Sequence, residues 1–206
     1  MSNFSLVMGF AGAEARPEYI ILAGIAGLLA GSFSMAAGEY VSVRSQREVF
    51  EQQIAMEEQE LEMSPKEEEE ELSLIYRAKG LPEREAAHLA RRIIANPRTA
   101  IDTLAREELG LDPSELGAPW TAALSSFFSF VIGALVPVLP YLMTTGRAAL
   151  IASATLSFAA LFGVGALVSI FTARGPLLSG GRMVGIGLLV AAITYAVGWL
   201  LGVSAG

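Results

Sequence analysis

Four glutamates are spaced symmetrically about a serine near residue 64. Glu57 and Glu60 lie seven and four residues before Ser64, and Glu68 and Glu71 lie four and seven residues after it. If two helices fold back antiparallel at this serine, the first pair comes level with the second, and the i, i+3 spacing keeps each pair on one helix face. Converging carboxylates are the ligands that hard or borderline divalent cations prefer. The spacing therefore predicts a metal-binding site.

The same residues have a plainer interpretation. Glutamate is abundant throughout 48–71, and residues 67–71 are five consecutive acids, so some pair matches almost any spacing. A solvated acidic helix face is the usual origin of such a charge run. Spacing alone leaves both interpretations open.

A second candidate group lies in an apolar stretch. Glu39 is the only acid between Tyr19 and Val43, and Met35 precedes it by one helical turn. A carboxylate inside a membrane usually belongs to an ion or proton pathway, and a thioether beside it suits a borderline transition metal. The alternative is that Glu39 reaches the cytoplasmic interface or pairs with Arg44, while the methionine only packs.

The only histidine lies in a Glu-x-x-His pattern. Glu85 and His88 have the i, i+3 spacing of a di-iron carboxylate helix, but such a centre uses two of these motifs and this chain has one. The chain has no cysteine, which excludes disulfides, thiolate metal sites and thiol catalysis.

Helices must position the glutamates. Residues 44–63 contain no Gly or Pro, so the helix before them is expected to continue through this stretch. Ser64 and Pro65, with Glu67 three residues after the cap, form a helix start, and Gly80 is a favoured end. The later boundaries fall at Pro82, Pro97 and Gly110.

The charges are concentrated in this acidic insert. The chain has 206 residues, 53% of them hydrophobic and 17% charged, with a net charge of −7. Residues 44–115 hold 10 Lys and Arg against 18 Asp and Glu, whereas the rest holds four Arg against three Glu. This division excludes a soluble single-domain enzyme, a disordered chain and a nucleic-acid binder.

The apolar remainder predicts membrane-spanning helices. A span needs about 20 apolar residues, and four stretches qualify: Tyr19–Val43, Trp120–Met143, Ala148–Thr172 and Met183–Val203. Residues 1–13 are apolar but long enough for only part of a span. We expect an all-α membrane protein, a five-helix transmembrane bundle with a partial first helix. A cytosolic helical insert at 44–118 separates residues 1–43 from 119–206.

Positive charges near the span ends set the expected orientation. Arg44, Arg47, Arg174 and Arg182 fall on one side, and Arg16 and Arg147 fall on the other. Positively charged loops stay cytoplasmic, so the insert and the predicted loop at 173–182 are expected in the cytosol. The short chain predicts a prokaryotic plasma membrane.

Glycine and proline predict helix contacts and distortions. The pairs Gly27-xxx-Gly31 and Gly181-xxx-Gly185 predict close helix packing. Pro137 and Pro140 predict a kink or local adjustment in the span Trp120–Met143.

A family resemblance rests on residues 34–46, Ser-Met-Ala-Ala-Gly-Glu-Tyr-Val-Ser-Val-Arg-Ser-Gln. With the acidic insert and three closing spans, this stretch resembles the vacuolar iron transporter family over essentially the whole chain. The resemblance implies a homodimer that exports Fe²⁺ and related divalent metals from the cytosol in exchange for protons. It also implies a cytosolic domain whose glutamates gather the metal. No prosthetic group and no enzymatic reaction are expected.

The resemblance also assigns residues. The family's hairpin glutamates fall on Glu57, Glu60, Glu68 and Glu71, and a further one falls on Glu108. The family's companion methionine is Leu104 here, which implies a more purely oxygen site, and the pathway methionine matches Met35.

One family residue has no counterpart in this chain. The family's pathway aspartate lies in a pattern resembling Asn-Asp-Gly-Leu-Val-Ser-Asn-Phe, and this chain begins Met1-Ser2-Asn3-Phe4. By that register the aspartate would lie three positions before Met1, which stands where the family commonly has valine. We expect a first helix truncated at its N-terminus, with a valine codon read as the start. The genomic sequence upstream tests this hypothesis.

The leading hypothesis is a proton-coupled exporter of ferrous iron, with Mn²⁺ or Zn²⁺ as alternative cargo. The five glutamates would collect the metal, and Met35 and Glu39 would pass it through the membrane. A membrane-anchored metal buffer or sensor without transport is the second hypothesis, and an iron oxidase is the third.

Overall fold

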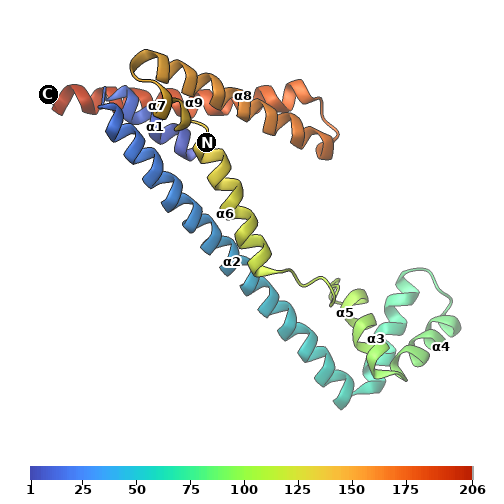
Figure 1. Ribbon diagram of the computed structural model, residues 1–206. Helices are drawn as coiled ribbons and strands as arrows, with labels where there is room; N and C mark the ends of the chain where they lie inside the picture. Colours follow the sequence, from blue (N-terminus) through green and yellow to red (C-terminus); the bar gives the residue numbers. More distant parts are fainter. Residues whose placement is uncertain (206) are drawn as a thin grey trace. The chain divides into compact units, whose positions relative to one another are not determined.

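The computed structural model describes residues 1–205, with side chains through residue 202, and all its regular elements there are α-helices (Figure 1). The helices are α1 (Ser2–Gly12), α2 (Pro17–Met63), α3 (Pro65–Ala78), α4 (Glu83–Ile94), α5 (Pro97–Glu107), α6 (Pro119–Leu135), α7 (Leu139–Met143), α8 (Gly146–Thr172) and α9 (Pro176–Ala205). They belong to two compact units, Met1–Gly38 with Ala123–Gly206, and Glu39–Ala122. The all-α class is confirmed, whereas the boundaries at 44 and 118 stay predictions.

In the part of the chain that the structure describes, three helices are long and apolar enough to cross a membrane: α2, α8 and α9. The apolar helix α6 has only 17 residues. The predicted helical continuation beyond Val43 is confirmed, because α2 runs without interruption to Met63. The count of five spans stays a prediction.

The stretch Trp120–Met143 was predicted as one span with a kink or local adjustment at Pro137 and Pro140. The change is larger than a kink, because the stretch breaks between α6 and α7. Pro137 has no N–H group, and the Val138 N–H turns to the Leu135 carbonyl, which frees the Ala134 carbonyl from its usual helical partner. Side chains of neighbouring helices donate hydrogen bonds to the carbonyl oxygens that the break leaves free. The Asn3 amide donates to the Ala134 oxygen at 2.7 Å, and the Ser153 hydroxyl donates to the Pro137 oxygen at 2.7 Å. Freed backbone groups at membrane depth are satisfied in this way by neighbouring helices.

The connection between α8 and α9 is shorter than the predicted loop at 173–182. The left-handed residue Ala173 ends α8, and Pro176 begins α9 three residues later. Proline fits the first helical turn because its fixed φ suits a helix and its missing N–H has no partner there. The prediction overlooked this signal because Arg174 and Arg182 suggested a polar loop.

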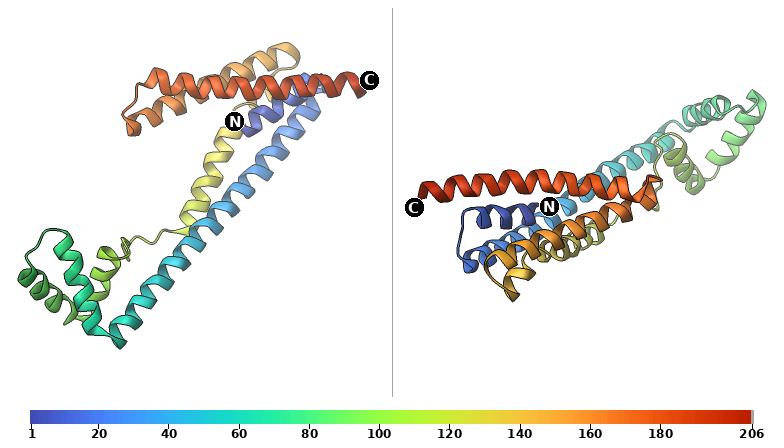
Figure 2. Two further views of the ribbon diagram at one scale, coloured as in Figure 1. Left: turned by 180° about the vertical axis from the view of Figure 1, so that it is seen from behind. Right: turned by 90° about the horizontal axis from the view of Figure 1, so that it is seen from above.

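Helix α1 lies between α8 and α9 in the apolar unit, as the right-hand view of Figure 2 shows. Phe4 is buried and meets Phe158 of α8 edge to face, with the ring centroids 5.4 Å apart. Gly198 of α9 lies so close to α1 that an added Cβ would collide with the Gly9 carbonyl oxygen. The backbones of α1 and α9 therefore meet directly.

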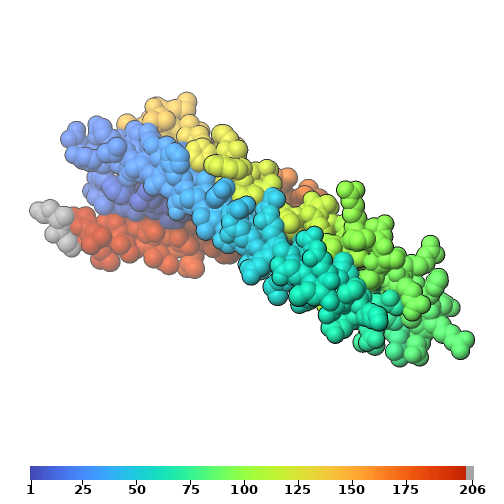
Figure 3. Space-filling model, turned by 90° about the horizontal axis from the view of Figure 1, so that it is seen from below, coloured from blue at the N-terminus to red at the C-terminus, as the bar shows by residue number. Residues whose placement is uncertain are grey.

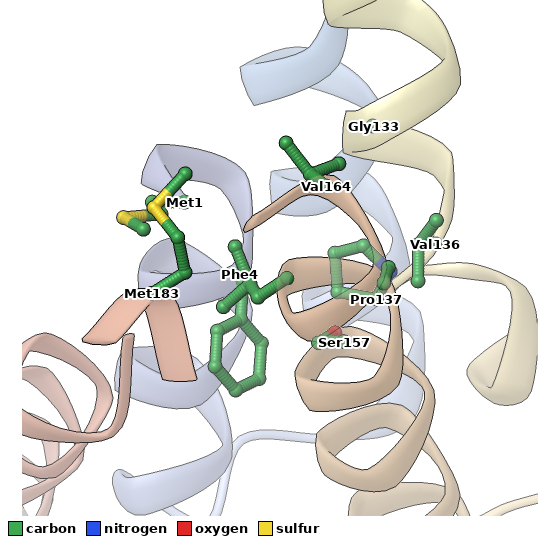
Figure 4. Close-up of a pocket in the computed structure, with 10 residues that line it drawn as sticks. Met1, Phe4, Gly133, Val136, Pro137, Ser157, Val164 and Met183 are labelled. Atoms are coloured by element: carbon green, nitrogen blue, oxygen red, sulfur yellow. The ribbon is translucent and has the colours of Figure 1, made fainter. Parts of the chain in front are cut away.

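An apolar cavity of about 320 Å³ lies beside the break after α6 (Figure 4). Phe4, Pro137 and Ser157 line it together with further residues of α8 and Met183 of α9. The helix break therefore leaves space inside the apolar unit.

The other unit holds the acidic insert, whose helices α3, α4 and α5 pack on one another (Figure 3). Leu72, Ala90 and Leu104 form its buried core. Ser64 occupies the predicted N-cap position of α3, but its side chain makes no capping hydrogen bond. Gly80 follows α3 with a φ of +101°, which glycine adopts without strain.

Candidate metal centre

Three helices bring one glutamate each to a common point. Glu57 lies near the end of α2, Glu68 lies in the first turn of α3, and Glu108 caps the end of α5. One carboxylate oxygen from each lies within 4.8 Å of the others. The apolar core under α3 and α5, with Leu72 and Leu104 fully buried, fixes the helices that present two of these groups.

Two of the three carboxylates are almost completely buried. Glu57 is 6% exposed and Glu68 is 4% exposed, whereas Glu108 lies at the surface. Each buried residue has one carboxylate oxygen, Oε2, without a hydrogen-bond partner in the part of the chain that the structure describes. A buried polar atom without a partner costs free energy, so this arrangement calls for a ligand.

The electrostatics of the group follow from burial and like charge. Burial raises the pKa of Glu57 to about 7, and the charges of Glu108 and Glu68 add to the rise. Burial likewise raises the pKa of Glu68 to about 7, with help from Glu108 and Glu71. The pKa of Glu108 is also raised, first by burial and then by the charge of Glu71 and a hydrogen bond with it.

Basic side chains of the insert pair with other acids. Arg91 binds Glu69 at 3.1 Å, Lys79 pairs with Glu107, and Arg106 pairs with two aspartates. Within residues 1–202, none of the five predicted metal ligands forms a salt bridge. No basic side chain in the described residues therefore neutralises the charge of the carboxylate group.

The spacing of the oxygens suits a divalent cation. Oxygen ligands lie about 2.0–2.6 Å from Mg²⁺, Ca²⁺ or a similar ion, so two ligands on opposite sides of it are roughly 4–5 Å apart. The 4.8 Å limit of the group falls in that range. With carboxylates alone, the site has no sulfur ligand to favour a soft metal.

The predicted register of the glutamates differs from the observed one. Glu57 was expected level with Glu71, but it groups with Glu68 instead. Helices α2 and α3 diverge from Ser64 at an open angle rather than running flat against each other (Figure 1). Glu60 and Glu71 are exposed and lie outside the group of three, although their charges still raise the pKa of Glu57.

Leu104 stands where the resemblance places a methionine ligand, and its side chain has no atom that could bind a metal. Its side chain is fully buried among apolar residues of the insert. Whatever metal the group binds, this position contributes packing.

The candidate pathway residues lie on α2, outside the carboxylate group. Met35 is 50% exposed and Glu39 is exposed. The alternative pairing of Glu39 with Arg44 is not observed, because this arginine binds Glu48 at 2.7 Å.

The Glu-x-x-His motif does not contribute to the carboxylate group. Glu85 and His88 are both exposed on α4, and the group of three contains neither. The structure therefore gives the iron oxidase hypothesis no centre in the described residues.

Sequence reasoning gave no role to Asn3. Its side chain is 5% exposed and joins α1 to α2 and α6 by hydrogen bonds. Asn3 could have been noticed as a single amide in an apolar stretch, because polar groups at membrane depth are costly and usually functional.

Known proteins resemble this chain over nearly its whole length. "Vacuolar iron transporter 1" of Oryza sativa subsp. japonica is 32% identical over 193 residues, which cover 93% of this chain and 77% of the relative. "Vacuolar iron transporter" of Acanthamoeba castellanii is 36% identical, with 88% and 69% covered, and "Vacuolar iron transporter 1" of Arabidopsis thaliana is 28% identical, with 93% and 77% covered. These relatives are named as transporters and not as enzymes.

The family model described as "VIT family" matches residues 1–199, which include the apolar helices and the insert with its three glutamates. Such a match over the whole length, together with the long apolar helices, identifies an integral membrane protein. This chain belongs to the VIT family.

Proposed function

We propose that this chain exports ferrous iron from the cytosol in exchange for protons, with Mn²⁺ and Zn²⁺ as further candidate cargo. The observation that carries the proposal is the pair of buried carboxylates on Glu57 and Glu68, each with an unpartnered oxygen, beside Glu108. The names of the relatives support iron as the cargo.

In this proposal the insert collects the metal and the membrane helices pass it on. The collecting residues are Glu57, Glu60, Glu68, Glu71 and Glu108. Met35 and Glu39 then form the pathway on α2. Protons compete with the metal for the carboxylates, because protonated carboxylates are poor ligands. The pKa of about 7 for two of them makes this competition effective near neutral pH.

The proposed assembly is a homodimer in which each chain supplies five spans: α1, α2, the pair α6 and α7, α8 and α9. The insert lies in the cytosol. The relatives are named for the vacuole, whereas the membrane that we propose for this chain is a prokaryotic plasma membrane. Imaging a tagged full chain in its host distinguishes the two locations.

Liposomes with an imposed pH gradient test transport directly. The full chain is expected to carry Fe²⁺ under anaerobic conditions, and Met35→Leu is expected to lower the flux at least about tenfold, since a pathway ligand is lost. His88→Ala is the matched control and retains full flux. No Fe²⁺ flux from the folded wild-type protein would contradict the proposal.

A metal buffer or sensor is the second candidate function. It is favoured by one observation: the three grouped glutamates lie within a single compact unit, and Met35 lies in the other. Binding of metal therefore needs no residue of the apolar unit. A wild-type protein that binds Fe²⁺ but carries none across the liposome membrane would establish this function instead.

A further inference from the structure

Asn3 is a buried amide at the meeting point of three apolar helices. It lies at the start of α1, and its Nδ2 atom donates to the Gly24 oxygen of α2 at 3.1 Å and to the Ala134 oxygen of α6 at 2.7 Å. Both amide protons are used in this way. The side chain holds the three helices together through its nitrogen alone.

These bonds determine which way the amide faces. Backbone carbonyls only accept hydrogen bonds, so the NH₂ group must face Gly24 and Ala134, and the Oδ1 atom must face elsewhere. That oxygen is buried and has no hydrogen-bond partner within residues 1–202. A bare amide oxygen at this depth costs free energy unless a donor or a cation reaches it.

The oxygen lies over a glycine of α2. A Cβ added at Gly27 would lie 2.6 Å from Oδ1 and 2.6 Å from a methyl carbon of Leu6. Gly27 therefore allows the amide to approach the helix closely. Asn3 and Gly27 both line a cavity of about 420 Å³ that opens to the surface of the apolar unit.

Met35 lines the same cavity, with Gly31, Ser34 and Phe130 also in its wall. Gly27 and Met35 are eight residues apart on one helix, or about 12 Å at 1.5 Å per residue. Asn3 and Met35 therefore mark two ends of one cavity. At about 30 Å³ per water molecule, the cavity holds on the order of ten waters, enough for a divalent ion with its first hydration shell.

We propose that Asn3 is a cargo-contacting residue of the ion pathway, whose Oδ1 atom receives the divalent cation at the end of this cavity remote from Met35. The inference rests on the proposed function of metal export. A neutral amide oxygen is a suitable transient ligand, because it attracts a cation more weakly than a carboxylate and releases it more readily. The thioether and the amide oxygen then act as successive contacts for the same ion.

Flux measurements in liposomes with Fe²⁺ alone separate this role from a structural one. Asn3→Ala removes the donors and the oxygen, and it is expected to raise the KM for Fe²⁺ at least fivefold. Asn3→Asp removes the NH₂ group but keeps an oxygen toward Gly27, and its charge attracts a cation more strongly than the amide does. Its KM is therefore expected not to rise above that of wild type, although its melting temperature falls. Ser5→Ala is the matched control, since Ser5 is buried on the same helix and bonds only within it; its KM should not change.

Other outcomes overturn the inference. Equal increases of KM in the alanine and aspartate variants, or losses confined to maximal rate and melting temperature, would assign Asn3 a purely structural role. If Asn3→Ala does not fold, Asn3→Ser takes its place. This variant withdraws the oxygen from Gly27 but keeps one hydrogen-bond donor, and its KM for Fe²⁺ is likewise expected to rise at least fivefold. Absence of flux in the wild-type protein would refute the proposed function itself, whereas normal wild-type flux with an unchanged KM in Asn3→Ala or Asn3→Ser would refute only the role of Asn3.

Discussion

At the scale of single residues, Glu57 and Glu68 bring like charges into a nearly buried space that contains no basic partner. Such an arrangement destabilises the metal-free protein and favours any ligand of opposite charge. Stability and metal affinity are therefore expected to respond to these residues in opposite directions.

Replacing Glu57 by glutamine separates the two effects. The change removes a buried charge, so the metal-free protein is expected to gain about 1 kcal/mol, or about 2–4 °C in melting temperature. It also removes a ligand, so Mn²⁺ affinity is expected to fall at least about tenfold. Thermal melting with a chelator and calorimetric titration with Mn²⁺ measure the two quantities. Glu58→Gln, an exposed neighbour, should change neither.

The raised pKa values predict how stability depends on pH. Glu57 and Glu68 have a pKa of about 7 in the folded chain against an ordinary value of 4.5. Between these values the folded state binds more protons than the unfolded state, so stability falls as pH rises from about 4.5 to 7. Melting of the full chain in detergent with a chelator should show this slope, and the double glutamine variant should flatten it.

Metal binding should have the opposite pH dependence. Deprotonation frees the carboxylates, so Mn²⁺ affinity is expected to rise as pH increases to about 7 and to level off above it. Titrations at pH 5.5 and 7.5 provide the measurement. An affinity that is equal at both values would mean that the metal is bound by other groups.

The site was predictable in its residue types but not in its geometry. The symmetry about Ser64 identified Glu57 and Glu68, yet it paired them incorrectly, because spacing along a chain does not give the angle between two helices. Glu108 came only from the family resemblance, since its approach to α2 depends on how α5 packs. Pro137 marked the place of the break after α6. No local pattern indicated that Asn3 would donate to the carbonyl freed there and leave its own oxygen without a partner in the described residues.

At the scale of helices, glycine decides how closely neighbours approach. Two glycine pairs were predicted to make close contacts. Gly27 and Gly31 do so, since a Cβ at either would collide with a side chain of α1 or α6. Gly181 and Gly185 do not, because nothing within the described residues lies within 4 Å of an added Cβ. A spacing of four residues places two glycines on one face of a helix, but it does not show whether a neighbouring helix packs against that face.

An alanine at Gly198 tests the contact between α1 and α9. The new methyl group would collide with the Gly9 carbonyl, so a loss of about 1–3 kcal/mol in stability is expected. Gly185→Ala on the same helix meets nothing and should be neutral or gain about 0.5–1 kcal/mol from helix propensity. Melting temperatures in detergent compare the two variants, and equal effects would refute the close contact.

Helix boundaries were predictable where proline and glycine mark them. The starts at Pro65 and Pro97 and the stop at Gly80 follow their local chemistry. The two errors concern the extent of each change. Pro137 predicted a kink or local adjustment but separates α6 from α7, and the loop predicted to reach Arg182 ends at Pro176.

At the scale of the whole molecule, proton coupling is the property that distinguishes an exchanger from a passive channel. Collapsing the pH gradient with a protonophore is expected to lower the initial Fe²⁺ flux at least about tenfold if protons drive the cycle. The same treatment should leave metal binding by the insert unchanged at constant pH. Flux that persists at its full rate would show that export does not use protons.

The meeting of α1 and α9 also restricts movement. Carbonyl groups and glycine Cα atoms of the two helices are in direct contact there, so sliding one helix along the other would first require these backbones to separate. We therefore expect the two helices to move together. Bending is left to the interrupted stretch between α6 and α7, where α1 and α8 hold freed carbonyls by single hydrogen bonds that can be exchanged.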